Sequence, residues 1–277
     1  MPRLAPLILL SSILRPTSAA APAQSRYVST WLCLEDCGAS SSQIAADLAQ
    51  LASPGVFTAA AFEAYDLLAD GTVGISHQRS RVSGAIRALG LRSEAMVVAW
   101  ETNATRAALA DAPRFIASLD AVVLAREGAN LTGINLDFEP DGNSHPDGPE
   151  PTPADGVAFA AFLNHVADFL HSRGLTLSVD IATWSPFWNW ALLAETRVDW
   201  LMDMESYQAS WPAFEKAVTQ AHKLLPADKY VAGMETHAFN ASELEQRFAL
   251  FKNLTIRKVA IWDSPVPETW LPFLAAL

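Results

Sequence analysis

Short apolar segments rich in β-branched and aromatic residues recur eight times along the chain, and most are followed by a stretch with helical spacing. Strands that alternate with helices are typical of parallel βα units, because a parallel connection must cross back over the sheet. Eight such units predict a single (β/α)₈ TIM barrel. The strands are expected at residues 27–33, 56–62, 95–100, 132–138, 175–181, 200–206, 230–235 and 258–262.

Four of the intervening helices have clear boundaries in the sequence. They are expected at residues 41–51, 153–173, 211–225 and 242–251. Gly174 and Pro226 follow the second and third of these, as residues that end helices commonly do. Ser242 and Glu245 have the spacing of a capping box at the start of the fourth.

The N-terminal residues indicate export. An apolar run of about eleven residues from Leu4 to Leu14 precedes small residues that end in Ala21-Pro22-Ala23. This pattern is typical of a secretory signal peptide, and a membrane anchor, the alternative, would need about 20 apolar residues. Cleavage after residue 23 leaves residues 24–277, close to the roughly 250 residues of one barrel domain. We therefore expect a secreted, monomeric protein that does not associate with membranes once the signal is cleaved.

Charge and composition exclude several classes of partner. The net charge is −11, which disfavours nucleic acid and anionic membrane surfaces as partners. The six histidines lack metal-ligand spacing, and no glycine-rich phosphate loop follows the first strand, so we expect no metal and no cofactor. Four N-x-S/T sequons are consistent with a glycoprotein; they begin at Asn103, Asn130, Asn240 and Asn253.

Two cysteines, Cys33 and Cys37, lie four residues apart at the end of the first expected strand. In an oxidising compartment they would close a small disulfide loop. A metal site is the alternative, and it would require further ligands nearby.

The fourth expected strand carries the most specific chemistry. Side chains alternate between faces along a strand, so Asn135, Asp137 and Glu139 share one face. Two carboxyls this close raise the pKa of one of them, which keeps a proton available near neutral pH. Cleavage of a glycosidic bond needs such a proton donor. The segment 140–153, rich in Pro, Gly, Asp and Asn, is expected to form a substrate-shaping loop at the rim of the cleft.

The stretch Gly133 to Glu139, G-I-N-L-D-F-E, resembles the fourth strand of glycoside hydrolase family 18, the chitinases and endo-β-N-acetylglucosaminidases, which carries the pattern D-x-x-D-x-D-x-E. Asp137 and Glu139 match the last two acids, whereas Thr132 and Asn135 replace the first two. The resemblance implies that Glu139 protonates the leaving oxygen. It also implies that Asp137 orients the N-acetyl group of the substrate, which attacks the anomeric carbon.

The replacement at Asn135 changes what this position can do. An amide cannot trade a proton with Asp137, but it can donate a hydrogen bond that holds the carboxylate in place. Loss of a neighbouring negative charge also makes Asp137 easier to ionise. We expect Asn135 to contribute to substrate binding and the site to be active with an altered pH dependence.

The sixth expected strand runs into Asp203-Met204-Glu205-Ser206-Tyr207, where strand alternation would place Asp203, Glu205 and Tyr207 on one face. The resemblance implies that Tyr207 donates a hydrogen bond to the acetamido oxygen; a packed aromatic is the alternative. Glu205 stands where the family more often has a neutral residue, and we expect it to bind substrate. Structural hydrogen-bond acceptance is the alternative for both acids.

Three further residues end expected strands and are assigned to substrate binding. Trp262 resembles the tryptophan that floors the sugar subsite in the family, and Trp100 ends the third strand. Glu235 ends the seventh strand, where barrel glycosidases of the double-displacement type carry their nucleophile, and it would then lie about 5 Å from Glu139. Other strand-end residues either line a sugar cleft or cap the barrel: Glu101, Asp180, Trp184 and Trp188.

These observations predict a secreted glycosidase that acts on an oligosaccharide or polysaccharide. The expected substrates are β-linked N-acetylglucosamine glycans, either chitin-like polymers or N-glycan cores, cleaved with retention through substrate-assisted catalysis. Two alternatives remain: double displacement by Glu139 and Glu235, and a chitinase-like carbohydrate-binding protein that has lost turnover.

Overall fold

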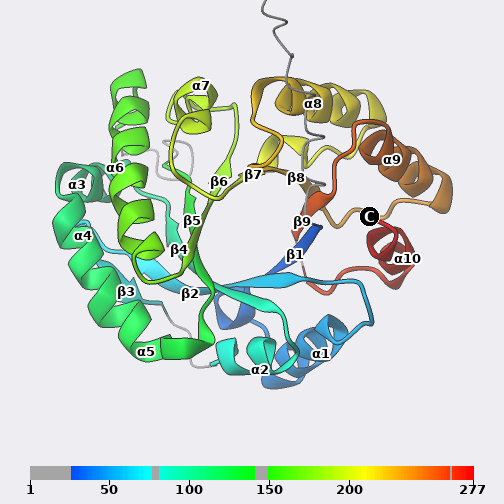
Figure 1. The fold of residues 1–277 in the computed structure, drawn as a ribbon, viewed down its shortest axis with the longest axis horizontal. Helices are drawn as coiled ribbons and strands as arrows, with labels where there is room; N and C mark the ends of the chain where they lie inside the picture. Colours follow the sequence, from blue (N-terminus) through cyan, green and yellow to red (C-terminus); the bar gives the residue numbers. More distant parts are fainter. Residues whose placement is uncertain (1–25, 77–80, 141–148, 263) are drawn as a thin grey trace, which may run out of the picture.

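The computed structural model describes residues 26–76, 81–140, 149–262 and 264–277 (Figure 1). Eight parallel strands form a closed barrel, because β1 pairs with both β2 and β9 and every other parallel strand pairs with its neighbours. These strands are β1 (Tyr27–Leu32), β2 (Ala59–Leu67), β4 (Arg92–Ala99), β5 (Gly133–Phe138), β6 (Thr176–Ile181), β7 (Trp200–Asp203), β8 (Tyr230–Glu235) and β9 (Lys258–Trp262). The predicted (β/α)₈ barrel is confirmed.

Helices surround the barrel on its outside (Figure 1). They are α1 (Ser41–Leu51), α2 (Ser83–Ala88), α3 (Thr102–Ala110), α4 (Ala112–Leu119), α5 (Ala125–Glu127), α6 (Pro153–His171), α7 (Trp190–Ala194), α8 (Trp211–Leu224), α9 (Ala241–Asn253) and α10 (Leu271–Ala275). No helix within the described ranges is long and apolar enough to span a bilayer.

The second strand differs most from its predicted position. Strand β2 begins three residues later than expected and continues to Leu67. The register shifts between Glu63 and Tyr65, and the strand then pairs antiparallel with β3 (Val73–Ile75). The sequence concealed this extension because Glu63 and Asp66 interrupt the apolar run, and β3 is too short to recognise.

The predicted start of α9 was also wrong. The capping box is formed by Asn240 and Glu243, two residues before the predicted Ser242 and Glu245. The Asn240 side chain accepts from the Glu243 N–H at 3.0 Å, and the Glu243 carboxylate accepts from the Asn240 N–H at 2.8 Å. Both candidate pairs have the same spacing, so local sequence could not separate them.

Strand alternation sorts the side chains into two cores. The outward residues Ile134, Leu136 and Phe138 are fully buried against the helices. Phe138 stacks against Phe159 and Phe162 of α6, with ring centroids 6.0 and 6.2 Å away. A second cluster fills the barrel interior; it includes Tyr27, Trp31, Ala61, Met96, Val98, Met202, Val231 and Ala260. The polar side chains of β5 therefore face a tightly filled interior.

Candidate active site

Asp137 and Glu139 lie together at the carboxyl ends of the barrel strands. Strand β5 carries Asp137 inward, and the N–H of Glu139 continues the ladder by donating to Ala99 at 2.8 Å. Both acids line a cavity of about 280 Å³, together with Tyr207, Glu235 and Trp262. Its walls also include Trp31, Trp100, Asp180, Trp184 and Met204. The structure thus brings together six of the eight predicted site residues.

Asp137 in β5 and Glu139 just after this strand interact electrostatically. Asp137 is 5% exposed, and burial raises its pKa well above the ordinary range; the nearby charges of Glu139, Asp180 and Glu63 raise it further. Asp137 and Glu139 are also joined by a side-chain hydrogen bond. Two carboxyl groups can form such a bond only when one of them is protonated. The raised pKa of Asp137 means that this pair holds a proton to a higher pH than an ordinary aspartate does.

Asp180 lines the cavity. The sequence alone left open whether this residue lines a cleft or caps the barrel. It projects inward from β6 and is 2% exposed. Burial raises the pKa of Asp180 well above its ordinary value, and a hydrogen bond from Asn135 opposes that effect. The alternation of Ser178 and Asp180 along the strand was the available signal. A third buried carboxyl next to Asp137 and Glu139 makes simultaneous ionisation of all three unfavourable.

Asn135 lies beneath the cavity. It is fully buried, and its amide nitrogen donates to Asp180 at 3.0 Å and to Ser178 at 3.1 Å. Its oxygen accepts from the Trp31 indole N–H at 3.3 Å. The expected hydrogen bond from Asn135 to Asp137 was wrong, because the amide is turned toward β6. Asn135 does not line the cavity itself. It positions Asp180 and Trp31, and both of these residues line the cavity.

The sixth strand of the barrel turns earlier than predicted. Strand β7 ends at Asp203, whose carboxylate accepts from the Glu205 N–H at 2.9 Å, and residues Met204–Ser206 form a 3₁₀ turn. Side chains three apart share a face of such a turn, so Met204 and Tyr207 face the cavity. The prediction of one face for Asp203, Glu205 and Tyr207 was wrong for this reason.

Glu205 therefore lies outside the cavity. Its carboxylate accepts from the Thr183 hydroxyl at 2.5 Å. Asp203 is fully buried next to Tyr230, whose hydroxyl donates to it at 3.3 Å. Burial raises the pKa of Asp203 from 3.8 to about 7.

Tyr207 is held in place by close packing. A Cβ added to Gly233 would lie 2.5 Å from Tyr207 Cε1 and 2.1 Å from the Asp203 carbonyl oxygen, so only glycine fits beneath the ring. Burial raises the pKa of Tyr207 well above 10, and the charges of Asp180, Asp137 and Glu139 add to this. Tyr207 thus stays a phenol that can donate a hydrogen bond into the cavity.

Tryptophans form the walls of the site. Trp31 makes edge contacts with Tyr207 and Trp262, with ring centroids 6.3 and 6.1 Å apart. Trp100 and Trp184 are more open, with 44% and 52% exposed surface. Aromatic faces of this kind bind the apolar faces of sugar rings. Trp31 was not predicted as a site residue, because an aromatic inside an apolar strand is indistinguishable from core by pattern alone.

Glu235 reaches the same cavity from β8 in a different environment. Its side chain is 41% exposed, and Oε2 lies 3.1 Å from His237 Nε2, which makes an ion pair when the imidazole is protonated. The charges that raise the pKa of Asp137 come from Glu139, Asp180 and Glu63. Asp180, on the neighbouring strand β6, is thus a buried carboxyl that raises the pKa of Asp137 alongside Glu139.

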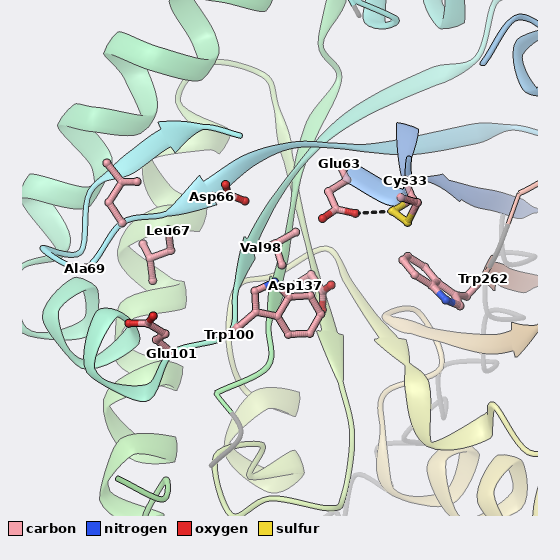
Figure 2. A pocket seen from close by; sticks show the side chains of 12 residues that line it. Cys33, Glu63, Asp66, Leu67, Ala69, Val98, Trp100, Glu101, Asp137 and Trp262 are labelled. Atoms are coloured by element: carbon pink, nitrogen blue, oxygen red, sulfur yellow. Dashed lines mark hydrogen bonds between the residues drawn. A yellow bond between two sulfur atoms is a disulfide. The ribbon is translucent and has the colours of Figure 1, made fainter. Parts of the chain in front are cut away.

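A larger cavity of about 720 Å³ adjoins the first (Figure 2). The two share Trp100, Asp137 and Trp262, so they form one continuous cleft. Figure 2 shows that strand β2 supplies Glu63 and Asp66 to this cavity, while Glu101 follows β4. Within the part of the chain that the structure describes, the lining includes no Lys or Arg, so this part of the cleft is acidic. The loop residues 141–148, predicted to shape the rim, lie outside the described residues.

The predicted disulfide between Cys33 and Cys37 is confirmed, and it borders the larger cavity. Glu63 lies close by, with its carboxyl 3.0 Å from Cys33 Sγ (Figure 2). Together the two sulfurs and this carboxylate have the spacing of a metal site. A metal would require the sulfurs as free thiolates, and the disulfide removes them as ligands.

Comparison of the structure with solved structures identifies chitinase-like barrels. A chitinase from Chromobacterium violaceum has a TM-score of 0.68 at 15% identity, covering 90% of this chain and 98% of that one. A class V chitinase from Pseudomonas fluorescens has a TM-score of 0.70 at 16% identity, with 90% and 98% covered. The spore cortex-lytic enzyme SleL of Bacillus megaterium has a TM-score of 0.73 at 13% identity, with 92% and 75% covered.

No family model and no curated protein matches the chain by sequence. The structural likeness therefore establishes the fold: a chitinase-like (β/α)₈ barrel. The function has to be argued from the residues of the cleft.

The pKa of Asp203 gives a test of its buried state. Folding raises the pKa of Asp203 from 3.8 to about 7. The Asp203 carboxyl therefore does not lower the free energy of unfolding below pH 4, where it is protonated in both states. It lowers the free energy of unfolding progressively between pH 4 and pH 7, and by a constant amount at higher pH. Asp203→Asn should remove about 4 kcal/mol of this pH-dependent loss, at roughly 1.4 kcal/mol per pKa unit. Urea unfolding of both proteins from pH 4 to pH 8 measures it. Glu215→Gln, on the exposed face of α8, is the control; parallel pH curves for wild type and Asp203→Asn would contradict the assignment.

Proposed function

We propose that the protein is a glycosidase that hydrolyses β-linked N-acetylglucosamine glycans with retention of configuration. The observation that carries this proposal is that Asp137 and Glu139 line one cavity at the mouth of the barrel, where the charge of Glu139 helps to raise the pKa of Asp137. Tryptophan walls and a phenol donor beside that pair suit a sugar with an acetamido group. The chitinase-like fold supports the same chemistry by analogy.

Each of the three catalytic residues has a distinct role in this mechanism. Glu139 donates its proton to the glycosidic oxygen while the acetamido carbonyl oxygen of the substrate attacks the anomeric carbon and the glycosidic bond breaks. Asp137 orients and polarises the acetamido N–H, and Tyr207 donates to the acetamido oxygen. A water molecule then attacks the anomeric carbon while the bond between that carbon and the acetamido oxygen breaks, which regenerates the acetamido group. The water gives its proton to Glu139, which restores the carboxyl group.

The charge of the cleft restricts the glycan. Glu63, Asp66 and Glu101 line the larger cavity next to Asp137, with no basic lining residue among those described. Carboxylates of an acidic glycan would meet like charge there, which costs binding energy. The cleft therefore suits a neutral N-acetylglucosamine polymer or N-glycan core.

We further propose that the chain is exported and glycosylated. The leader pattern at residues 1–23 supports export. The disulfide Cys33–Cys37 suits an oxidising compartment, and all four sequon asparagines are exposed on the barrel surface. Mass spectrometry of the chain from the culture medium of a secreting eukaryotic host should show an N-terminus at Gln24 and glycan on at least one sequon. An intact Met1 or retention in the cytoplasm would contradict export.

Loss of the proton donor should abolish turnover without abolishing binding. Glu139→Gln keeps the size of the side chain but cannot donate a proton to the leaving group, so kcat on a fluorogenic aryl chitooligosaccharide should fall by about 10² to 10⁴-fold. Glu205→Gln, outside the cavity, is the matched control and should retain wild-type kcat. Equal rates for wild type and Glu139→Gln would end the proposal. Oligosaccharide binding by wild type without any product would favour the carbohydrate-binding alternative.

Two experiments distinguish substrate-assisted catalysis from double displacement: a comparison of two substrates and a substitution at Glu235. A neighbouring-group mechanism requires the acetamido group, so an aryl chitobioside should be cleaved and the matched aryl cellobioside, with a hydroxyl at that position, should not. Asp137→Asn should lower kcat strongly, while Glu235→Gln should change it by less than about tenfold, because the Glu235 side chain is 41% exposed to solvent. Cleavage of both substrates, combined with loss of activity in Glu235→Gln, would establish double displacement instead.

A further inference from the structure

A buried carboxyl group lies in the barrel interior below the cleft. Glu94 belongs to β4, where residues 94, 96 and 98 alternate toward the interior and Met96 and Val98 join the interior cluster. The side chain of Glu94 is fully buried. Its partner in β5 is Gly133, two residues before Asn135. Glu94 therefore lies one inward layer deeper in the barrel than Asn135.

The surroundings of Glu94 favour its ionised form. Nε of Arg92 lies 3.4 Å from Glu94 Oε1, and the guanidinium is stacked on the ring of Trp200 at 4.5 Å. The Ser178 hydroxyl donates to Glu94 Oε2 at 2.9 Å. Burial raises the pKa of Glu94, and the charge of Arg92 and the hydrogen bond from Ser178 oppose this effect. Tyr27 of β1 also faces Glu94, and burial raises the pKa of this phenol well above 10, so it adds no charge.

A chain of hydrogen bonds leads from Glu94 to the cleft. The Ser178 hydroxyl has one proton, and Glu94 is the nearer of its two acceptors. The Ser178 oxygen in turn accepts from the Asn135 amide at 3.1 Å, and the same amide nitrogen donates to Asp180 at 3.0 Å. The Trp31 indole N–H can only donate, so its 3.3 Å contact with the Asn135 oxygen fixes the orientation of the amide. Glu94 thus orients Ser178 and Asn135, and through them Asp180.

The charge of Glu94 also acts on the carboxyl groups above it. Burial is the largest cause of the raised pKa of Asp180, and the charges of Glu139 and Glu94 raise this pKa further. The charge of Asp180 in turn raises the pKa of Asp137. Charges in the barrel interior are poorly screened, because little water separates them. A negative charge at Glu94 therefore increases the proton affinity of the whole cluster.

The other titratable groups that face this cluster are neutral or negative, so they do not offset Glu94. They are Glu63 of β2, Asp137 of β5, Glu139 just after β5, Tyr207 after β7 and Glu235 of β8.

We propose that Glu94 is a positioning residue for the acid catalyst: its buried carboxylate, acting through Ser178 and Asn135, keeps a proton bound among the carboxyl groups of the cleft. The inference rests on the proposed function, because proton donation to the glycosidic oxygen requires that proton to stay bound as the pH rises. Glu94 acts through other residues and not on the substrate, so its effect is on the pH dependence of the reaction.

Removing the charge of Glu94 should lower the proton affinity of the cluster. In Glu94→Gln, which keeps the size of the side chain and an acceptor for Ser178, the titration midpoint of Asp180 should fall by about half a unit to one unit. Carboxyl ¹³C NMR of aspartate-labelled protein measures this midpoint, and Asp180→Asn assigns the signal. The upper limb of the pH profile of kcat on the aryl chitooligosaccharide should move to lower pH in the same variant.

Glu127→Gln is the matched control. Glu127 is 4% exposed and accepts from the hydroxyls of Tyr65 and Ser83 at 2.6 Å each, but it lies in α5, outside the barrel. The same substitution there should lower the melting temperature without moving the Asp180 titration or the pH profile. Glu94→Asp keeps the charge and should stay closer to wild type than Glu94→Gln.

The outcomes separate this inference from the proposed function. An unchanged Asp180 titration in Glu94→Gln, or an equal shift in Glu127→Gln, removes the role of Glu94 and leaves the proposed function standing. No turnover by wild type removes the proposed function, and with it the catalytic role of Glu94, even where the titration shifts. If Glu94→Gln does not fold, Glu94→Met, which fills a similar volume without charge, decides by the same titration.

Discussion

The site depends on one constraint: the carboxyl groups that point into the barrel are largely excluded from water. The interior of an eight-stranded barrel is just wide enough for its own side chains, so acids at the ends of inward strand positions face one another. Asp137 and Asp180 are 5% and 2% exposed, and burial is the largest cause of the raised pKa of each. Burial and mutual repulsion therefore favour a proton held among Asp137, Glu139 and Asp180 over full ionisation of all three.

The same constraint explains the polar layer beneath the acids. Asn135 connects three strands, by donating to Ser178 and Asp180 and by accepting from Trp31. An amide in this position adds no further negative charge below Asp137. Close packing also holds Tyr207 in place, since any residue other than glycine at position 233 would clash with its ring. The side chains that line the cavity thus lie on or directly after barrel strands, over a layer of hydrogen-bonded and closely packed groups.

The cleft changes character along its length. On the Trp100 side it is broad and acidic, whereas an adjoining hollow beyond Trp184 is lined by neutral amides, hydroxyls and indoles. Exposed tryptophans mark both ends of the catalytic cavity. The acidic side of the cleft disfavours an anionic ligand, because the like charges would repel each other.

Period-two patterning and strand-helix alternation determined the barrel, the inward direction of Asp137 and Glu139, and the bounds of β8, β9 and α1, because these follow from local backbone geometry. The turn after Asp203, which turns Glu205 away and brings in Met204, depends on a carboxylate that caps its own turn. The contact of Asn135 with Asp180 depends on the pairing of β5 with β6. Its contact with Trp31 depends on barrel closure, which brings together residues 104 apart in the chain. Sequence alone specified which face each side chain takes; only the closed tertiary structure decided which side chains meet, because that depends on contacts between strands far apart in the chain.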